Sequence, residues 1–169
     1  EVAEKDGKLI ILEEYIRGDM MDGMLKGALF SEKETGKIAM DLCRALYVLH
    51  SLNIVHRDVK PENIILRGGG AVLLDLDASR VFSEEKQARN DTVILGTTGF
   101  AAPEQYGLSQ TDGRADIYAL GVTMNIMLTG DHPSVRVASG RMGRIISRCI
   151  MVHQGKRYRD IKSLMEVLG

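Results

Sequence analysis

One stretch of this sequence reads His56-Arg57-Asp58-Val59-Lys60-Pro61-Glu62-Asn63, and it carries more information than any other. An aspartate and an asparagine lie five residues apart, and a lysine follows the aspartate by two. In phosphoryl transfer an aspartate can accept or orient a hydroxyl proton, a lysine can hold a phosphate, and an asparagine can bind a metal ion. A polar turn between two apolar segments would explain the stretch more simply, but further motifs follow it along the chain.

Four short motifs lie downstream at ordered intervals. An aspartate after an apolar segment is common, so the first of them, Asp75-Leu76-Asp77, is weak evidence by itself. The order and spacing of the whole set are more informative than any one member. The other three are Gly96-Thr97-Thr98-Gly99-Phe100-Ala101-Ala102-Pro103-Glu104, Asp116-Ile117-Tyr118-Ala119-Leu120-Gly121-Val122 and Gly155-Lys156-Arg157-Tyr158.

The composition limits what the chain can be. Its 169 residues are enough for one domain, and an apolar content of 44% is ordinary for a globular protein. A formal net charge of −1 argues against a general nucleic-acid binder. No apolar run approaches the roughly 18–20 residues that span a bilayer, and residues 1–6 lack the pattern of a signal peptide. Cys43 and Cys149 have no metal or CxxC spacing, so we expect reduced core thiols and a cytoplasmic protein.

Apolar patterns in the first half predict a strand, a helix and a hairpin. The run at 8–12 predicts a buried strand. Ser31 followed by Glu34 is a capping box, and the helical repeat after it predicts an amphipathic helix that ends near Asn53. A glycine turn at 68–70 between two short apolar runs predicts a hairpin.

The second half is predicted to be helical. Residues 116–128 are apolar on nearly every side, and a helix with that pattern is buried rather than amphipathic. Two further helices are expected around 145–150 and 161–168. The many methionines are best explained as adaptable core packing.

The motifs together resemble those of eukaryotic-like Ser/Thr protein kinases, most closely the bacterial kinases of the Firmicutes type. The resemblance implies a mainly α-helical large lobe of an α+β fold, with a buried central helix and short β-hairpins at the nucleotide face. The chain is then a single domain over 1–169, in which 1–18 are a remnant of a small-lobe strand and the hinge, and 19–169 form the large lobe. No glycine-rich loop, strand lysine or partner glutamate precedes the hinge, so we expect the small lobe to be absent from this chain.

The resemblance also implies catalytic roles. Asp58 would position the acceptor hydroxyl, Lys60 would support the transferred phosphate, and Thr97 would hydrogen-bond both and help to seat the substrate. Lysine two residues after the aspartate is typical of Ser/Thr kinases rather than tyrosine kinases. The acceptor would therefore be a protein serine or threonine.

ATP and Mg²⁺ are the implied cofactors, with Mn²⁺ as an alternative metal. The backbone of Glu14 and Ile16 would hold adenine at the hinge, and Asn63 and Asp75 would hold the metal. Asp77 stands where the family has a glycine of positive φ, a backbone region that aspartate tolerates better than most residues.

Several residues are expected to be structural. His56 and Arg57 support the loop at 56–63, and Asp116 would accept backbone amides of that loop. Glu104 would form a buried ion pair with Arg157. Because an arginine precedes the catalytic aspartate, regulation by phosphorylation is expected, with Thr92 as the candidate phosphosite and Ser83 second.

Partners and alternatives complete the expectation. The partners are a protein substrate and ATP, with no nucleic acid and no membrane segment, and self-association through the uncovered small-lobe face is expected. The alternatives are a pseudokinase that acts as a binding module, and a small-molecule kinase of the aminoglycoside-phosphotransferase kind. By the same resemblance, the segment 133–144 is short, because the family usually has a further helix there that helps to dock protein substrates. The basic C-terminal quarter is explained by default as a solvated face, and otherwise as a docking surface for an acidic partner.

Overall fold

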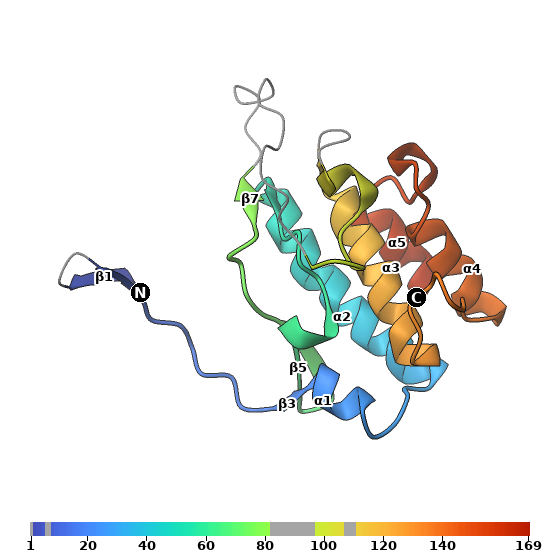
Figure 1. Cartoon of the computed structure of the whole chain (residues 1–169), viewed down its shortest axis with the longest axis horizontal. Helices are drawn as coiled ribbons and strands as arrows, with labels where there is room; N and C mark the ends of the chain where they lie inside the picture. The colour runs from blue at the N-terminus through green and yellow to red at the C-terminus, as the bar shows by residue number, and fades with distance from the viewer. Residues whose placement is uncertain (1, 6–7, 82–96, 107–110) are drawn as a thin grey trace.

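The computed structural model describes residues 2–5, 8–81, 97–106 and 111–169. Helices form most of its body, and short strands lie at their edges (Figure 1). The α-helices are α1 (Met21–Leu25), α2 (Glu32–Ser51), α3 (Arg114–Thr129), α4 (Gly140–Cys149) and α5 (Ile161–Leu168). The strands are β1 (Val2–Lys5), β2 (Lys8–Ile11), β3 (Asp19–Met20), β4 (Ile54–Val55), β5 (Ile64–Arg67), β6 (Gly70–Leu73) and β7 (Arg80–Val81), and short 3-10 turns span Pro61–Asn63, Pro103–Tyr106 and Gln154–Lys156.

Helix α2 begins at the predicted capping box. The Ser31 amide donates to Glu34 Oε2 at 2.9 Å, and the Glu34 amide donates to Ser31 Oγ at 3.3 Å. The helix buries one face, which includes Ile38, Leu42 and Leu46, and ends at Ser51. The predicted amphipathic helix and its end near residue 53 are therefore confirmed.

Helix α3 is the central element of the core. Its buried side chains include Ile117, Leu120 and Met124, as the apolar run predicted, and it packs against both α2 and α4. A Cβ atom at Gly121 would lie 2.5 Å from Cβ of Cys149, so glycine permits the close approach of α3 and α4. Both cysteines are buried free thiols, as expected.

The β5–β6 hairpin forms at the predicted place, with the predicted glycine turn. Ile64 pairs with Leu73, and two turn glycines take positive φ, Gly68 at 57° and Gly69 at 77°. Strand β3 pairs with the other edge of β5, and β4 pairs with β7 in a separate ladder. Helix α2 contacts both β4 and β6.

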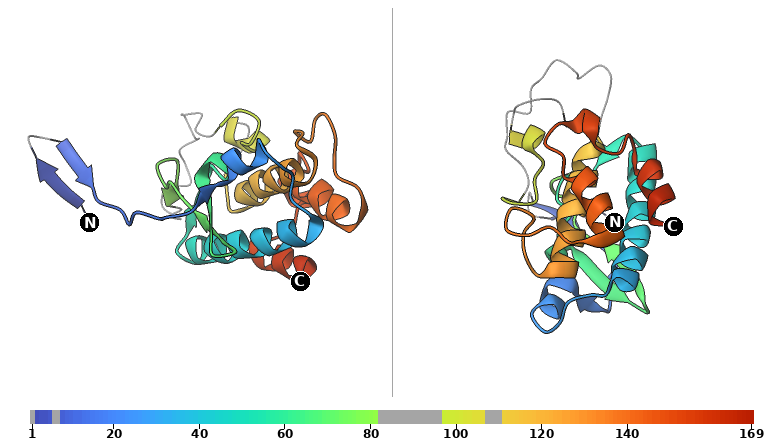
Figure 2. Two further views of the ribbon diagram at one scale, coloured as in Figure 1. Left: turned by 90° about the horizontal axis from the view of Figure 1, so that it is seen from below. Right: turned by 90° about the vertical axis from the view of Figure 1, so that its right-hand side faces the viewer.

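The expected buried strand at 8–12 is wrong in its burial. Strand β2 pairs only with β1, a strand that the polar N-terminal residues did not predict. Ile11 is 59% exposed and Leu12 is 57% exposed. The hairpin stands away from the helical body, at the end of an irregular segment at 12–17 (Figure 1, Figure 2). An apolar run predicts burial only where another element covers it, and here none of the described elements does.

Among the described residues, no helix combines the length and the apolar character that crossing a membrane requires.

Candidate active site

Asp116 anchors the loop at 56–63. It is fully buried in the first turn of α3. Its Oδ2 accepts the His56 amide at 2.9 Å, and its Oδ1 accepts the Arg57 amide at 2.8 Å. His50 Nε2 lies 2.8 Å from the same Oδ2. The predicted contact of Asp116 with this loop is present, and it fixes a backbone that takes a positive φ of 71° at Arg57.

His56 joins the loop to the end of β6. Its ring is buried, with Nδ1 3.3 Å from the Asp58 amide and Nε2 3.1 Å from the Leu74 carbonyl. Because a backbone amide only donates and a carbonyl only accepts, Nδ1 accepts and Nε2 carries the proton. The Leu74 amide in turn donates to the Asn63 carbonyl at 2.8 Å. This network sets the position of Asp75 relative to Asp58.

Asp58 is the centre of a polar cluster. Its Oδ1 accepts the Thr97 hydroxyl at 2.8 Å and the Thr97 amide at 3.1 Å. Its Oδ2 lies 2.7 Å from Lys60 Nζ and 3.0 Å from Asn63 Nδ2. Lys60 also donates to Thr97 Oγ1. The predicted contacts of Thr97 with Asp58 and Lys60 are present, and together they tie the segment at 97–102 to the loop.

The environment of Asp58 favours its ionised form. Burial raises the pKa of Asp58, but the hydrogen bond from Lys60, those from Thr97 and the charge of Lys60 together lower it more. The pKa therefore lies below its ordinary value. A carboxylate offers about four lone-pair sites, and the four donors here use that number. An additional hydroxyl would therefore have to displace or share one of these bonds.

The oxygen donors near this cluster fit a magnesium ion with phosphates. Asn63 uses its amide nitrogen to bond Asp58, both at the carbonyl and at the side chain, so its amide oxygen stays available. Asp75 is exposed, and among the described residues only its Oδ1 accepts a hydrogen bond, from the Asp77 amide at 2.9 Å. Within the described ranges no group of three or more His, Cys, Asp or Glu could hold a metal. Mg²⁺ commonly takes one or two carboxylates and completes its shell with phosphate and water, which matches this sparse set.

The expected positive φ at Asp77 is wrong. Among the described non-glycine residues, positive φ occurs at Asn53, Arg57 and Asp75, where Asp75 has 66°. The Asp75 side chain accepts the amide two residues on, a local bond that helps aspartate to tolerate this backbone region. The strained position therefore belongs to the candidate metal ligand itself.

Glu104 and Arg157 form the predicted buried pair. Arg157 Nη1 lies 2.6 Å from Glu104 Oε1, and Nη2 lies 2.8 Å from Oε2. The other guanidinium bonds go to the carbonyls of Met151, Arg114 and Val152. All five N–H donors of the arginine are thereby used, so the pair holds the segment at 103–106 against the C-terminal part of the chain.

Three supporting residues were not predicted. Gln105 donates from Nε2 to the Arg57 carbonyl at 3.0 Å and accepts the Ala102 amide at 2.9 Å. His50 contacts Asp116. His132 Nε2 lies 2.8 Å from the carbonyl of Gly99. Polar side chains that bond to backbone atoms leave no periodic signal in the sequence. His50 was a usable hint, because it lies in the last turn of a predicted amphipathic helix.

The remaining predicted residues are not brought to the cluster. Glu14 is exposed in the irregular segment, 3.6 Å from Arg67, and Ile16 is half-buried there. No described contact links either one to Asp58. The candidate phosphosites Thr92 and Ser83 lie outside the described residues.

Comparisons with known proteins agree with this geometry. The family model described as "Protein kinase domain" matches residues 1–166. Serine/threonine-protein kinase PknB of Mycobacterium leprae is 31% identical over 127 residues, covering 74% of this chain and 20% of that protein. Serine/threonine-protein kinase PknA of Nostoc is 28% identical over 188 residues, covering 98% and 33%. Serine/threonine-protein kinase DCLK3 of the mouse is 32% identical over 134 residues, covering 79% and 17%. The chain thus spans a third or less of these relatives.

Proposed function

This chain belongs to the protein kinase domain family, and from that premise we propose that it supplies the large lobe of a bacterial eukaryotic-like Ser/Thr protein kinase. The observation that carries the proposal is the cluster in which Asp58 accepts bonds from Lys60, Asn63 and Thr97. In the parent protein the reaction would be transfer of the ATP γ-phosphoryl group to a protein serine or threonine. Residues 1–18 would be the remnant of a small-lobe strand and the hinge, and residues 19–169 would form the large lobe.

Asp58 would orient the acceptor hydroxyl. Its lowered pKa keeps it ionised at neutral pH, and a carboxylate can accept a hydrogen bond from an incoming hydroxyl. That hydroxyl would replace one of the present donors, and the Thr97 hydroxyl is the only uncharged O–H among them. Positioning of this kind typically contributes about 10²–10⁴-fold in rate.

Lys60 would neutralise charge on the transferred group. Its ammonium lies between Asp58 and Thr97, so it can contact a phosphate placed beside the acceptor without leaving the cluster. Lysine is a compact donor of three hydrogen bonds and suits this task. Lysine at this position supports a Ser/Thr acceptor over tyrosine.

Asn63 and Asp75 would hold Mg²⁺, or Mn²⁺, through their free oxygens, and the backbone of Glu14 and Ile16 would hold adenine. The bound metal would neutralise phosphate charge in the reaction. The chain's own contribution is positional: the bond from the Leu74 amide to the Asn63 carbonyl keeps the two candidate ligands in adjacent, mutually fixed segments.

Four finer points belong to the same proposal. The motif sequences at 75–80 and 99–106 support a kinase of the Firmicutes type. Buried, unbridged Cys43 and Cys149 fit a reducing cytoplasm. Exposed apolar side chains such as Ile11 and Leu76 support self-association of the isolated chain, and Thr92 would be the regulatory phosphosite.

The test is a transfer assay on the parent protein with radiolabelled ATP and a mixture of protein acceptors. Acid hydrolysis of the labelled product then identifies the acceptor residue. We expect label on phosphoserine or phosphothreonine. Label on phosphotyrosine alone would contradict the assignment, and nucleotide binding without any transfer would make the parent a nucleotide-binding module instead.

A further inference from the structure

The region between His132 and Arg159 has an unusual charge. It contains no aspartate or glutamate, although the whole chain has a formal net charge of −1. Surface segments of ordinary domains mix positive and negative charges. A segment of this length without acidic residues therefore needs negative charge from elsewhere, either from other parts of the chain or from a binding partner. Its seven cationic residues are Arg136, Arg141, Arg144, Arg148, Lys156, Arg157 and Arg159.

Four of the seven are occupied within the chain. Three form ion pairs with acidic residues outside the segment, and one donates to the C-terminal carbonyls of α5. Their charges are therefore compensated or committed to structure. The contacts are Arg136–Asp131 at 3.0 Å, Arg157–Glu104 at 2.6 Å, Arg159–Asp160 at 2.9 Å, and Arg141 Nη2 to the Val167 carbonyl at 2.6 Å.

The other three converge on one open depression beside α4. Arg144, Arg148 and Lys156 line a volume of about 580 Å³, together with the hydroxyl residues Ser139 and Ser147. No acidic residue lines it. Within the described part of the chain, none of the three forms an ion pair. The three cations of this segment that form no described ion pair thus line one depression.

The depression has a built shape. A Cβ atom at Gly143 would lie 1.9 Å from the Ala138 carbonyl oxygen, so only glycine lets the chain at 138 cross the first turn of α4. Ser139 precedes the helix without a side-chain capping bond, which leaves the partial positive charge of the helix start directed to this side. The Arg148 guanidinium lies 4.5 Å from the centre of the Tyr158 ring, which restrains it against that ring.

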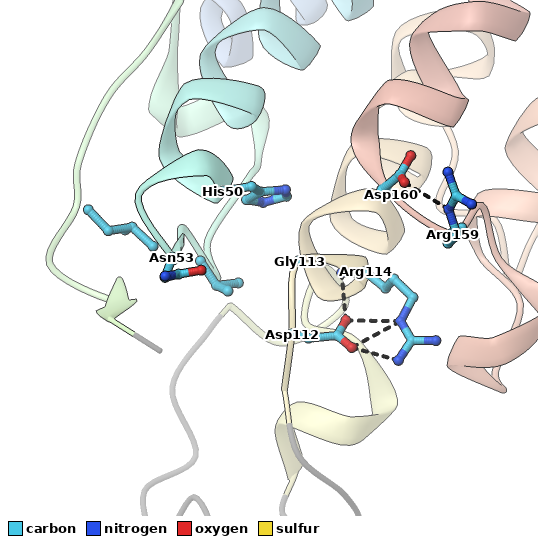
Figure 3. Close-up of a pocket in the computed structure, with 9 residues that line it drawn as sticks. His50, Asn53, Asp112, Gly113, Arg114, Arg159 and Asp160 are labelled. Atoms are coloured by element: carbon cyan, nitrogen blue, oxygen red, sulfur yellow. Dashed lines mark hydrogen bonds and ion pairs between the residues drawn. The ribbon is translucent and has the colours of Figure 1, made fainter. Parts of the chain in front are cut away.

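A second depression of the protein shows the contrast. It contains two arginines, and each is paired: Arg114 with Asp112 at 2.6 Å, and Arg159 with Asp160 (Figure 3). Both aspartates line the same depression. Neither arginine of this second depression is therefore free to bind an acidic ligand. The depression beside α4 has three cations without a described ion pair.

Glu32, a described acid close to the start of α4, lines a different depression. A Cβ at Gly140 would lie 3.4 Å from Glu32 Oε1, and Glu32 lines a neighbouring depression with residues of α3's C-terminal end. Glu32 is absent from the lining of the depression beside α4 that Arg144, Arg148 and Lys156 line, the basic depression. The stretch at 131–139, between α3 and α4, also contains no helix that could cover this face.

We propose that the basic depression beside α4 docks an acidic segment of a protein substrate in extended conformation, a proposal that rests on the kinase function above. Arg144 and Arg148 are one helical turn apart, with an expected separation of about 5–6 Å between their Cβ atoms. Alternate side chains of an extended peptide lie on one side, about 6–7 Å apart. Two carboxylates separated by one residue therefore match the two guanidinium groups, and Lys156 and the serine hydroxyls supply further donors.

The position of the depression suits docking rather than chemistry. Helix α4 packs on α3, and α3 lies between α4 and α2 (Figure 1). A segment held on α4 would be a part of the substrate remote from its acceptor residue. Its contribution would be to raise the local concentration of the acceptor at the Asp58 cluster.

The test measures binding of a fluorescent peptide, whose core is Gly-Glu-Ser-Glu-Gly, to the full 169-residue chain by polarisation at low salt. A peptide with glutamine in place of both glutamates is the ligand control. Arg144→Gln with Lys156→Gln should weaken binding about tenfold or more, because each lost charged hydrogen bond removes a substantial interaction. The matched variant is Lys26→Gln with Arg44→Gln, which removes the same two residue types from exposed pairs on α1's end and α2.

Each outcome decides the proposal. Loss of binding in the first variant alone supports it. Equal weakening of peptide binding in the matched variant would show that the peptide is held by general charge attraction. Equal binding of the glutamate and glutamine peptides would show that the chain has no site for carboxylates. Either result overturns the proposal. Tighter competition by a single-stranded oligonucleotide or by phosphatidylserine vesicles would assign the surface to another partner and also overturn it. The assay needs no ATP and no turnover, so its failure leaves the kinase function standing, and failure of the transfer assay leaves the binding result readable.

Discussion

At the scale of residues, the candidate site depends on a few carboxylates that accept several donors each. Asp116 holds two backbone amides and His50, and Asp58 holds Lys60, Asn63 and Thr97. Carboxylates that accept several hydrogen bonds fix loops that have no regular hydrogen-bonded structure of their own. Their positions set the geometry of the site more than the surrounding strands do.

The first prediction concerns the charge of Asp58. Lys60→Met should raise the pKa of Asp58, because the bond from Lys60 is the largest cause that lowers it. A pKa that is lower in the folded chain means that ionisation stabilises the fold above the unfolded value near 3.8, and that this contribution is lost as pH falls through the folded value. In the variant this contribution should be smaller, and its loss should be complete at a higher pH. NMR titration of aspartate carboxyl carbons measures it.

Lys26→Met serves as the control for that titration. It breaks an exposed pair with Asp22 and should leave the pKa of Asp58 where it was. An Asp58 pKa that does not move when Lys60 is replaced would contradict the assigned cause.

The second prediction concerns the pair of Glu104 and Arg157. Glu104→Ala and Arg157→Ala should each lower the free energy of unfolding by about 3–5 kcal/mol, because each leaves a buried charge uncompensated. The double variant should cost less than the two together. Denaturant unfolding measures this cycle. The exposed pair Asp131–Arg136 should show a coupling of only about 0–1 kcal/mol, and additive losses at the buried pair would show that its members act independently.

At the scale of elements, the sequence predicted the helices and the hairpin that have a clear local pattern. The capping box and glycine turn located α2 and the β5–β6 hairpin, and the apolar run located α3. Strand β2 was placed but its burial was not, because burial depends on a covering element that the local pattern does not contain. Gln105 and His132 were missed for a related reason: their partners are backbone atoms distant in sequence.

The third prediction tests the contact of α3 with α4. Gly121→Ala should destabilise the fold by about 1–3 kcal/mol, because the new Cβ would lie 2.5 Å from that of Cys149 and the two helices must separate. Gly36→Ala in α2 is the matched control. Nothing lies within 4 Å of its Cβ, so that change should stabilise by about 0.5–1 kcal/mol. Thermal unfolding of both variants measures the difference, and equal effects of the same sign would refute the close packing.

At the scale of the whole molecule, a packed helical body carries an uncovered N-terminal hairpin (Figure 2). An isolated two-stranded hairpin is marginally stable in water, and its apolar residues Ile11 and Leu12 are exposed. The candidate site lies in the body. The described residues there include the groups proposed to act on the acceptor and the transferred phosphate, Asp58 and Lys60, and the proposed metal ligands Asn63 and Asp75. Residues that would orient the α- and β-phosphates of ATP from a small lobe are not among the motifs of this chain.

The fourth prediction follows for the chain as given. The 169-residue chain should bind ATP weakly and show essentially no turnover, since positioning of the phosphates supplies most of the catalysis in phosphoryl transfer. It should also associate at high concentration, because exposed apolar patches favour association. Turnover matching that of the parent protein would contradict the first expectation. A strictly monomeric species in light scattering would contradict the second.

The central claim is that the Asp58 cluster performs phosphoryl transfer in the parent protein. The most direct measurement compares initial rates of radiolabel transfer for Asp58→Asn and for Asp22→Asn. The second is the same substitution at a half-buried aspartate of α1 whose described ion pair is with Lys26. With both variants folded, Asp58→Asn should lower the rate by about 10²–10⁴-fold, and Asp22→Asn should leave it within about twofold. A normal rate in Asp58→Asn would contradict the claim.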